Sequence, residues 1–299
     1  MRTSWQHLIE TQEVIIADGG MGTLLLARGL ERGSAPELWN VEHPEVVRNI
    51  HASYVAAGAQ IILSNSFGAN RLRLSAHHLE ARAVELNTAA ARLARTEADR
   101  ADYAVLVAGS MGPTGILLEP LGELRYEDAV AAFSEQASAL IDGGVDVLWI
   151  ETMSDLMEVR AAVEACQKIA LSVPRVTTMT FDTHGRTMMG VTPEKALTTM
   201  RELGVAALGA NCGNGPAELE SVIEAMRRLD SESILIAKAN AGHPHMEGQR
   251  TTYDATPEIM AAYARRAHDL GARIIGSCCG STPDHTRAIA TALREPRPS

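Results

Sequence analysis

The sequence predicts an α/β protein folded as a single (β/α)8 TIM barrel. Three observations favour this fold: eight short apolar runs recur along the 299 residues, a helix-length amphipathic stretch follows each run, and hydrophobicity within the runs is continuous. Continuous hydrophobicity is typical of parallel strands covered by helices. A chain of this length with eight βα units suits one barrel. A doubly wound open sheet is the alternative arrangement.

Each run has the length of a buried strand and ends in residues unsuited to a core. In chain order the runs are 14–20, 61–67, 104–113, 145–152, 176–182, 205–213, 234–242 and 272–280. Their end residues are Asp18, Asn65, Ser110, Glu151, Asp182, Asn211 with Cys212, Asn240, and Cys278 with Cys279. The carboxyl ends of barrel strands carry the active site, so we expect these residues at one rim.

The stretches between the runs carry helix signals. Residues 126–144 space their apolar residues three and four apart and close on glycine. Segments 192–204, 256–271 and 282–293 each open with threonine followed by proline, a combination typical of a helix start. We therefore predict one domain over residues 1–299, with short tails at roughly 1–10 and 295–299.

Composition limits the class of protein. The formal net charge of −10 disfavours nucleic acid and anionic membranes as partners. No apolar stretch is long enough to span a bilayer, and the first residues lack the apolar segment of a signal peptide. Four cysteines are too few for a disulfide-stabilised secreted fold, so we expect a cytoplasmic protein.

Three of the four cysteines lie at predicted strand ends beside glycine: Cys212, Cys278 and Cys279. They follow the sixth and eighth strands, which lie only one strand apart in a barrel. Three thiolates with a fourth position left open is the pattern of a catalytic zinc site. Structural or redox cysteines are the alternative. Cys166 falls inside a predicted helix, where we expect it to pack in the core.

A metal at this site would bind a thiol substrate in the open position. Zinc removes the thiol proton, and three cysteinate ligands keep the bound sulfur electron-rich. Alkyl transfer to sulfur suits this environment better than hydrolysis, which needs a strongly Lewis-acidic metal acting on water.

Seven segments together resemble the homocysteine S-methyltransferase family, from about residue 10 to residue 295. They read ADGGMGTLL, SNSFGANRLRL, VAGSMGPTG, WIET, GANCG, KANAGHP and GSCCGSTPDHTRAI. The resemblance implies a (β/α)8 barrel and places the family's zinc ligands on the same three cysteines. It implies that Asp18 and Glu151 hold the amino group of homocysteine. Backbone amides at Gly19 are expected to receive its carboxylate, and Asn240 to fill the fourth zinc position before homocysteine binds.

The methyl donor is less evident, and glycine betaine or a related onium compound is the first expectation. Bacterial proteins described as betaine–homocysteine methyltransferases share several segments, although the tryptophan ahead of EHP in the mammalian enzyme has no clear counterpart at the same spacing. An onium cation needs aromatic faces, for which Trp39, Phe67 and Tyr253 are the candidates. The alternatives are a stand-alone homocysteine subunit that receives methyl from a separate corrinoid protein, and a catalytically silent zinc- or thiol-binding barrel.

Overall fold

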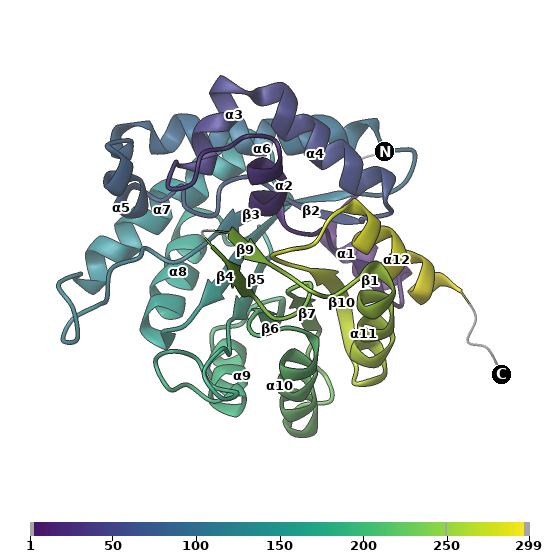
Figure 1. The fold of residues 1–299 in the computed structure, drawn as a ribbon. Coiled ribbons are helices and arrows are strands. Elements are labelled where there is room, and N and C mark those ends of the chain that lie inside the picture. Colours follow the sequence, from purple (N-terminus) through teal and green to yellow (C-terminus); the bar gives the residue numbers. More distant parts are fainter. Residues whose placement is uncertain (1–2, 249, 296–299) are drawn as a thin grey trace.

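Eight parallel strands close into a barrel with helices around it (Figure 1). The structure is a computed structural model and describes residues 3–248 and 250–295. The barrel strands are β1 (Ile15–Ile16), β2 (Ile61–Leu63), β3 (Leu106–Met111), β4 (Val147–Met153), β5 (Arg175–Met179), β6 (Ala207–Cys212), β7 (Leu235–Ala239) and β10 (Ala272–Ser277). They pair in the order β1-β10-β7-β6-β5-β4-β3-β2, and a parallel bridge between Ala17 and Ile61 closes the ring. The predicted single barrel is confirmed, and the open sheet is excluded.

Helices follow the strands as the sequence predicts. The α-helices of the described residues are α1 (Trp5–Thr11), α2 (Met21–Ala27), α3 (Trp39–Glu42), α4 (Pro44–Ala56), α5 (Arg71–Leu74), α6 (Ala83–Arg100), α7 (Tyr126–Gly143), α8 (Leu156–Ile169), α9 (Pro193–Glu202), α10 (Pro216–Leu229), α11 (Pro257–Asp269) and α12 (Pro283–Arg294). Short 3-10 helices cover Pro36–Leu38, Ser75–His77 and Glu80–Arg82. Helices α9, α11 and α12 begin at proline after threonine, which confirms the predicted starts.

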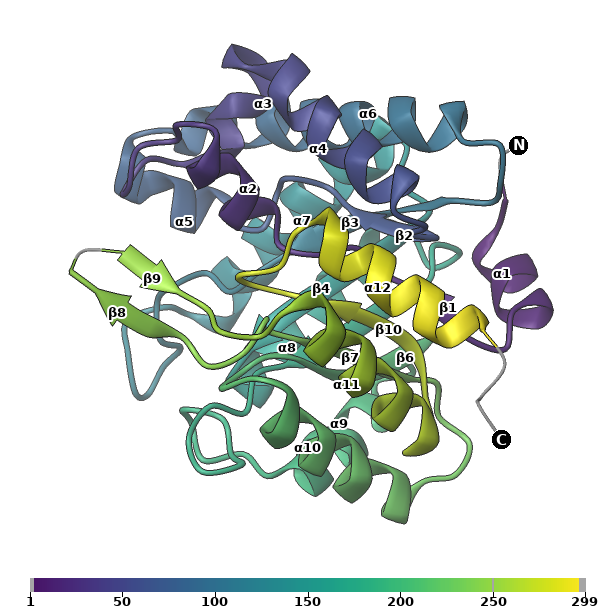
Figure 2. The ribbon, with the colours of Figure 1, turned by 45° about the vertical axis from the view of Figure 1, so that its right-hand side comes forward.

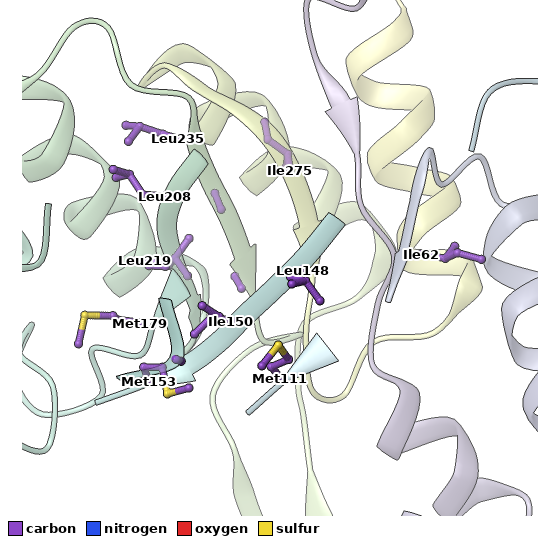
Figure 3. Close-up of a cluster of buried hydrophobic side chains, with 14 of the residues drawn as sticks. Ile62, Met111, Leu148, Ile150, Met153, Met179, Leu208, Leu219, Leu235 and Ile275 are labelled. Carbon is purple, nitrogen blue, oxygen red and sulfur yellow. The ribbon is translucent and has the colours of Figure 1, made fainter. Parts of the chain in front are cut away.

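Successive side chains along each strand point alternately into the barrel and toward the helices, so the core has two layers. Side chains such as Leu106 and Val147 point into the barrel and form one apolar cluster. Their neighbours, among them Leu148 and Ile150, point outward and pack against the helices. Figure 3 shows part of this outer layer, in which Leu208 and Leu235 lie on adjacent strands. The strands are therefore buried on both faces, which explains their continuous hydrophobicity.

Helix α1 lies at the amino end of the barrel, within the predicted N-terminal tail. Trp5 and Leu8 of this helix are buried in the cluster inside the barrel. The segment predicted as a tail, roughly residues 1–10, is therefore helical from Trp5 onward, and the apolar face of this helix packs onto the barrel. Residues 1–2 and 296–299, which belong to the predicted tails, lie outside the described residues.

An antiparallel hairpin, β8 (His245–Glu247) and β9 (Arg250–Thr252), follows β7 and was not predicted. Figure 2 shows the hairpin extending from one end of the molecule, with α1 at the opposite end. Within residues 3–248 and 250–295, none of the helices combines the length and the apolar character needed to cross a membrane.

Candidate active site

Three cysteine sulfur atoms lie together at the carboxyl ends of β6 and β10. The Sγ atoms of Cys212, Cys278 and Cys279 all lie within 4.8 Å of one another, in an arrangement that could hold a metal ion. The Sγ atoms of Cys212 and Cys278 are 2.8 Å apart, longer than the roughly 2.05 Å of a disulfide bond. All three cysteines are free. The predicted convergence of the sixth and eighth barrel strands is confirmed.

Cys212 is oriented by an unusual backbone conformation at the end of β6. Its φ angle is +61°, and that of Thr152, at the end of β4, is +60°, a region that residues with a side chain seldom adopt. The Asn211 side chain connects the two: Oδ1 accepts a hydrogen bond from the Thr152 N–H (2.9 Å), and Nδ2 donates to Thr152 Oγ1 (2.7 Å) and to Cys212 Sγ (3.4 Å). Asn211 therefore holds two strained strand ends together beside the sulfur cluster.

Asn240, which follows β7, connects the loops that carry the cysteines. Its Oδ1 accepts a hydrogen bond from the Cys279 N–H (3.0 Å), and its Nδ2 donates to the Gly213 carbonyl (2.6 Å). The Cys278 N–H donates to the Ala239 carbonyl at 2.7 Å. Asn240 thus fixes the spacing of the loops after β6 and β10, while its expected place at the metal stays a prediction.

Gly19 lies against the loop that follows the paired cysteines. A Cβ atom at this position would lie 2.5 Å from Ser281 Oγ and 2.9 Å from the Tyr54 hydroxyl, so a larger residue would displace the loop. The neighbouring Gly20 N–H donates to Ser281 Oγ at 2.9 Å. The first strand end is thereby brought to the sulfur cluster, as predicted, and the role of Gly19 toward a substrate carboxylate remains a prediction.

Asp18 and Glu151, at the ends of β1 and β4, are buried together with Lys238 of β7. Lys238 Nζ donates to Asp18 Oδ1 at 2.8 Å, and the Leu63 N–H donates to Asp18 Oδ2 at 2.7 Å. Ser110 Oγ donates to Glu151 Oε1. Sequence reasoning missed Lys238, although a signal was present: it is the one charged residue in the apolar run 234–242, and a buried lysine needs a carboxylate partner.

The charges of the site shift its pKa values in defined directions. Burial raises the pKa of Glu151 to about 7, although the positive charge of Lys238 opposes the shift. Burial lowers the pKa of Lys238, but the Asp18 and Glu151 carboxylates outweigh it, and the net change is upward. Hydrogen bonds from Cys212 and Cys278 hold the pKa of Cys279 well below its ordinary value. The thiolate, the form that binds metal, is thus favoured at Cys279, whereas hydrogen bonding to the neighbouring sulfur atoms raises the pKa of Cys212.

The three aromatic candidates and Cys166 lie in different environments, and only Tyr253 contacts the sulfur cluster. The Tyr253 side chain interacts with the Cys279 sulfur, and its ring lies over Gly280, where a Cβ atom would be 2.2 Å from Tyr253 Cγ. Phe67 lies under the Arg73 guanidinium, and Trp39 packs against His43. Cys166 is fully buried in the outer core layer, which confirms its predicted packing role.

Comparison with known proteins supplies independent observations. A model of the family described as homocysteine S-methyltransferase matches residues 15–293. The methionine synthases of Mycobacterium tuberculosis and Mycobacterium leprae are 33% and 34% identical over 98% and 96% of this chain, which spans only about a quarter of their length (26% and 25%). The metallated form of the homocysteine methyltransferase MmuM from Escherichia coli is 26% identical, with a TM-score of 0.78 over 96% of this chain and 98% of that protein. Its oxidised form has a TM-score of 0.79 at the same identity and coverage.

Proposed function

Because the chain belongs to the homocysteine S-methyltransferase family, we propose that it transfers a methyl group to the sulfur of homocysteine and so forms methionine. The observation that carries the proposal is the cluster of Cys212, Cys278 and Cys279 at the barrel mouth, near enough to the buried Asp18 and Glu151 for the Cys278 charge to act on both carboxyl groups. Sulfur ligands suit an ion that activates a thiol, and carboxylates suit the ammonium group of an amino acid.

We infer that the ion is zinc, held by the three cysteines. The fit rests on the donor set: three free sulfur atoms within 4.8 Å of one another, one of them with a lowered pKa. Soft thiolate ligands favour zinc, and three of them leave one position for a substrate. When bound, zinc would supply the positive charge that ionises a thiol at neutral pH.

The residues of the chain position the two reactants. Glu151 accepts hydrogen bonds from the homocysteine ammonium, and the backbone at Gly19 receives the carboxylate, so the sulfur points toward the cysteines. With glycine betaine as donor, the sulfur–carbon bond forms as the carbon–nitrogen bond breaks, and dimethylglycine leaves as a neutral amine bearing its carboxylate. The ring of Tyr253 supports this donor, because an aromatic face beside the sulfur cluster suits an onium cation.

A separate corrinoid protein is the second candidate donor. The methionine synthases that match this chain are about four times longer, and the chain covers 26% of one and 25% of the other. A homocysteine barrel that receives its methyl group from a corrinoid protein is consistent with the similarity to methionine synthases. With either donor, we propose a cytoplasmic location, since free cysteines are typical of reducing compartments.

A panel of donors tests the function. Purified protein with zinc and homocysteine is supplied in parallel with betaine, dimethylsulfoniopropionate, S-methylmethionine and methylcobalamin, and methionine is measured. We expect methionine with betaine and about one zinc per chain by metal analysis. Turnover with methylcobalamin alone would replace betaine by the second candidate, and no methionine with any of these donors would contradict the proposed function.

A further inference from the structure

We propose that Glu218, in the first turn of α10, is a positioning residue that holds Cys212 in the conformation needed to bind the metal. Glu218 acts through the backbone of the turn that follows Cys212 and is not itself a ligand. The inference rests on the proposed zinc site and deepens it, because it names a residue on which the metal affinity of the cysteine cluster depends.

The first observation is that the Glu218 carboxylate accepts hydrogen bonds from two different loops. Its Oε2 accepts one from the Asn214 N–H, in the turn after β6, and its Oε1 accepts one from the Gly185 N–H, in the loop after β5. Both hydrogen bonds measure 3.1 Å. Hydrogen bonds to an ionised carboxylate are stronger than those between neutral groups. One side chain on α10 therefore joins the loop after β5 to the turn that carries Cys212.

A glutamate at the start of the neighbouring helix is used differently. Glu194, in the first turn of α9, forms a side-chain hydrogen bond with Thr192, the N-cap residue of the same helix. The N-cap residue of α10 is Gly215, which has no side chain that could cap the helix. The Glu218 side chain is thus directed at the two loops rather than at a capping residue of its own helix.

The second observation is that both loops contain a backbone conformation that is unfavourable for residues with a side chain. Cys212, two residues before Asn214, has a φ angle of +61°, and His184, directly before Gly185, has a φ angle of +52°. Such conformations persist only where the surrounding structure holds them. Glu218 binds the backbone just after each of these residues, so it stabilises both turns.

The third observation is that Glu218 lies next to the backbone of Cys212. Cys212, Gly213 and Glu218 line the same small cavity. Glu218 Oε2 lies 3.7 Å from the position that a Cβ atom would take on Gly213, and the Gly213 carbonyl accepts a hydrogen bond from Asn240. The turn is therefore fixed by both Glu218 and Asn240. Loss of Glu218 should let the Cys212 sulfur move away from the other two sulfur atoms.

Zinc affinity, measured by competition with a chelator, tests this role. Residues that orient metal ligands typically change metal affinity by about 10- to 100-fold, so Glu218→Ala should bind zinc at least about tenfold more weakly than the wild type. Glu218→Asp keeps the negative charge at the helix start but is one methylene shorter, so it should lose zinc affinity to a similar extent. Glu194→Ala is the matched control and should bind zinc within about twofold of the wild type, because it leaves the Cys212 turn unchanged.

Hydrogen exchange of the metal-free protein supplies a readout that does not depend on zinc. The amides of Gly185 and Asn214 should exchange at least about tenfold faster in both Glu218 variants than in the wild type and the control. Wild-type zinc affinity in Glu218→Ala or in Glu218→Asp, or unchanged exchange at both amides, would show that the proposal is wrong. Failure of the wild type to bind zinc would instead contradict the proposed metal site, and the exchange rates would still decide whether Glu218 holds the turn.

Discussion

The two ends of the barrel interior are formed by the same eight strands and differ in chemistry. At the amino end, Trp5 and Leu8 of α1 pack onto inward-facing residues such as Ile15 and Ile274 in an entirely apolar cluster. At the carboxyl end, the inward-facing positions hold an ion pair, a second carboxylate and three sulfur atoms.

The difference shows that position along a strand, rather than the strand itself, separates stability from chemistry. On β4, Val147 and Trp149 belong to the apolar interior, and Glu151, two residues further along the same face, is part of the site. On β7 the change occurs between Ile236 and Lys238. Substitutions at the two ends should therefore have effects of different kinds.

The largest effect is expected for Cys278→Ala at the carboxyl end. Structural zinc sites contribute about 10–16 kcal/mol of binding free energy, so one of three protein ligands would account for roughly 3–5 kcal/mol. We expect zinc content to fall far below one per chain and methylation to be lost, as measured by metal analysis and methionine formation. The control is Cys166→Ala, the same change in the core, which should retain zinc and lose about 1 kcal/mol of unfolding free energy. Equal zinc in both variants would remove Cys278 from the metal site.

The next largest effect is expected for Leu8→Ala at the amino end. Leu8 is 1% exposed, and truncating a leucine in a core costs about 2–5 kcal/mol. Urea unfolding should show this loss, whereas the KM for homocysteine and the zinc content should stay at the wild-type values. A change in KM with unchanged stability would mean that the two ends of the barrel are not independent.

The sequence predicts the barrel and the sulfur cluster because both depend on local signals. Strands buried on two faces require continuous apolar runs, and residues such as Asp18 and Cys212 stand out where such a run ends. The fold then brings these ends together without further information.

Other features depend on contacts that no local pattern records. Thr152 and Cys212 adopt a positive φ although neither is glycine, and the Asn211 side chain forms hydrogen bonds with both residues. Helix α1 is short, and only its packing under the barrel separates it from a tail. Lys238 is visible in its apolar run, but its pairing with Asp18, 220 residues away, follows only from the closed barrel.

A buried histidine that belongs to neither end of the barrel interior should make the stability of the protein depend on pH. His51 on α4 is fully buried, and neither ring nitrogen has a hydrogen-bond partner among the residues described. Burial lowers its pKa from 6.5 to about 4, so the folded protein keeps it neutral while the unfolded chain takes up a proton below pH 6.5. The unfolding free energy should therefore fall as pH decreases, by about 2 kcal/mol at pH 5 from this group alone.

His51→Leu should remove that share of the acid sensitivity. The measurement is urea unfolding of the wild type and of the variant at pH 8 and at pH 5. For each protein, the unfolding free energy at pH 5 is subtracted from that at pH 8, and the two results are compared. The substitution changes packing equally at both pH values. The change in unfolding free energy between pH 8 and pH 5 therefore reports only the proton that His51 takes up on unfolding. Equal pH dependence in the two proteins would show that His51 takes up no extra proton on unfolding.

The smallest effect, and the finest probe of the carboxyl end, is expected for Tyr253→Phe. The change removes the hydroxyl that interacts with Cys279 and keeps the ring that covers Gly280. A neutral hydrogen bond contributes about 1 kcal/mol, so zinc affinity, measured by competition with a chelator, should weaken about fivefold with stability unchanged. Tyr126→Phe, whose hydroxyl donates to Glu164 on the outer surface, is the matched control and should bind zinc as the wild type does. Zinc affinity unchanged in Tyr253→Phe would place the hydroxyl outside the set of contacts that support the metal. The influence of the carboxyl end on the metal would then be confined to the sulfur atoms and to the side chains, such as Asn211 and Asn240, that orient them.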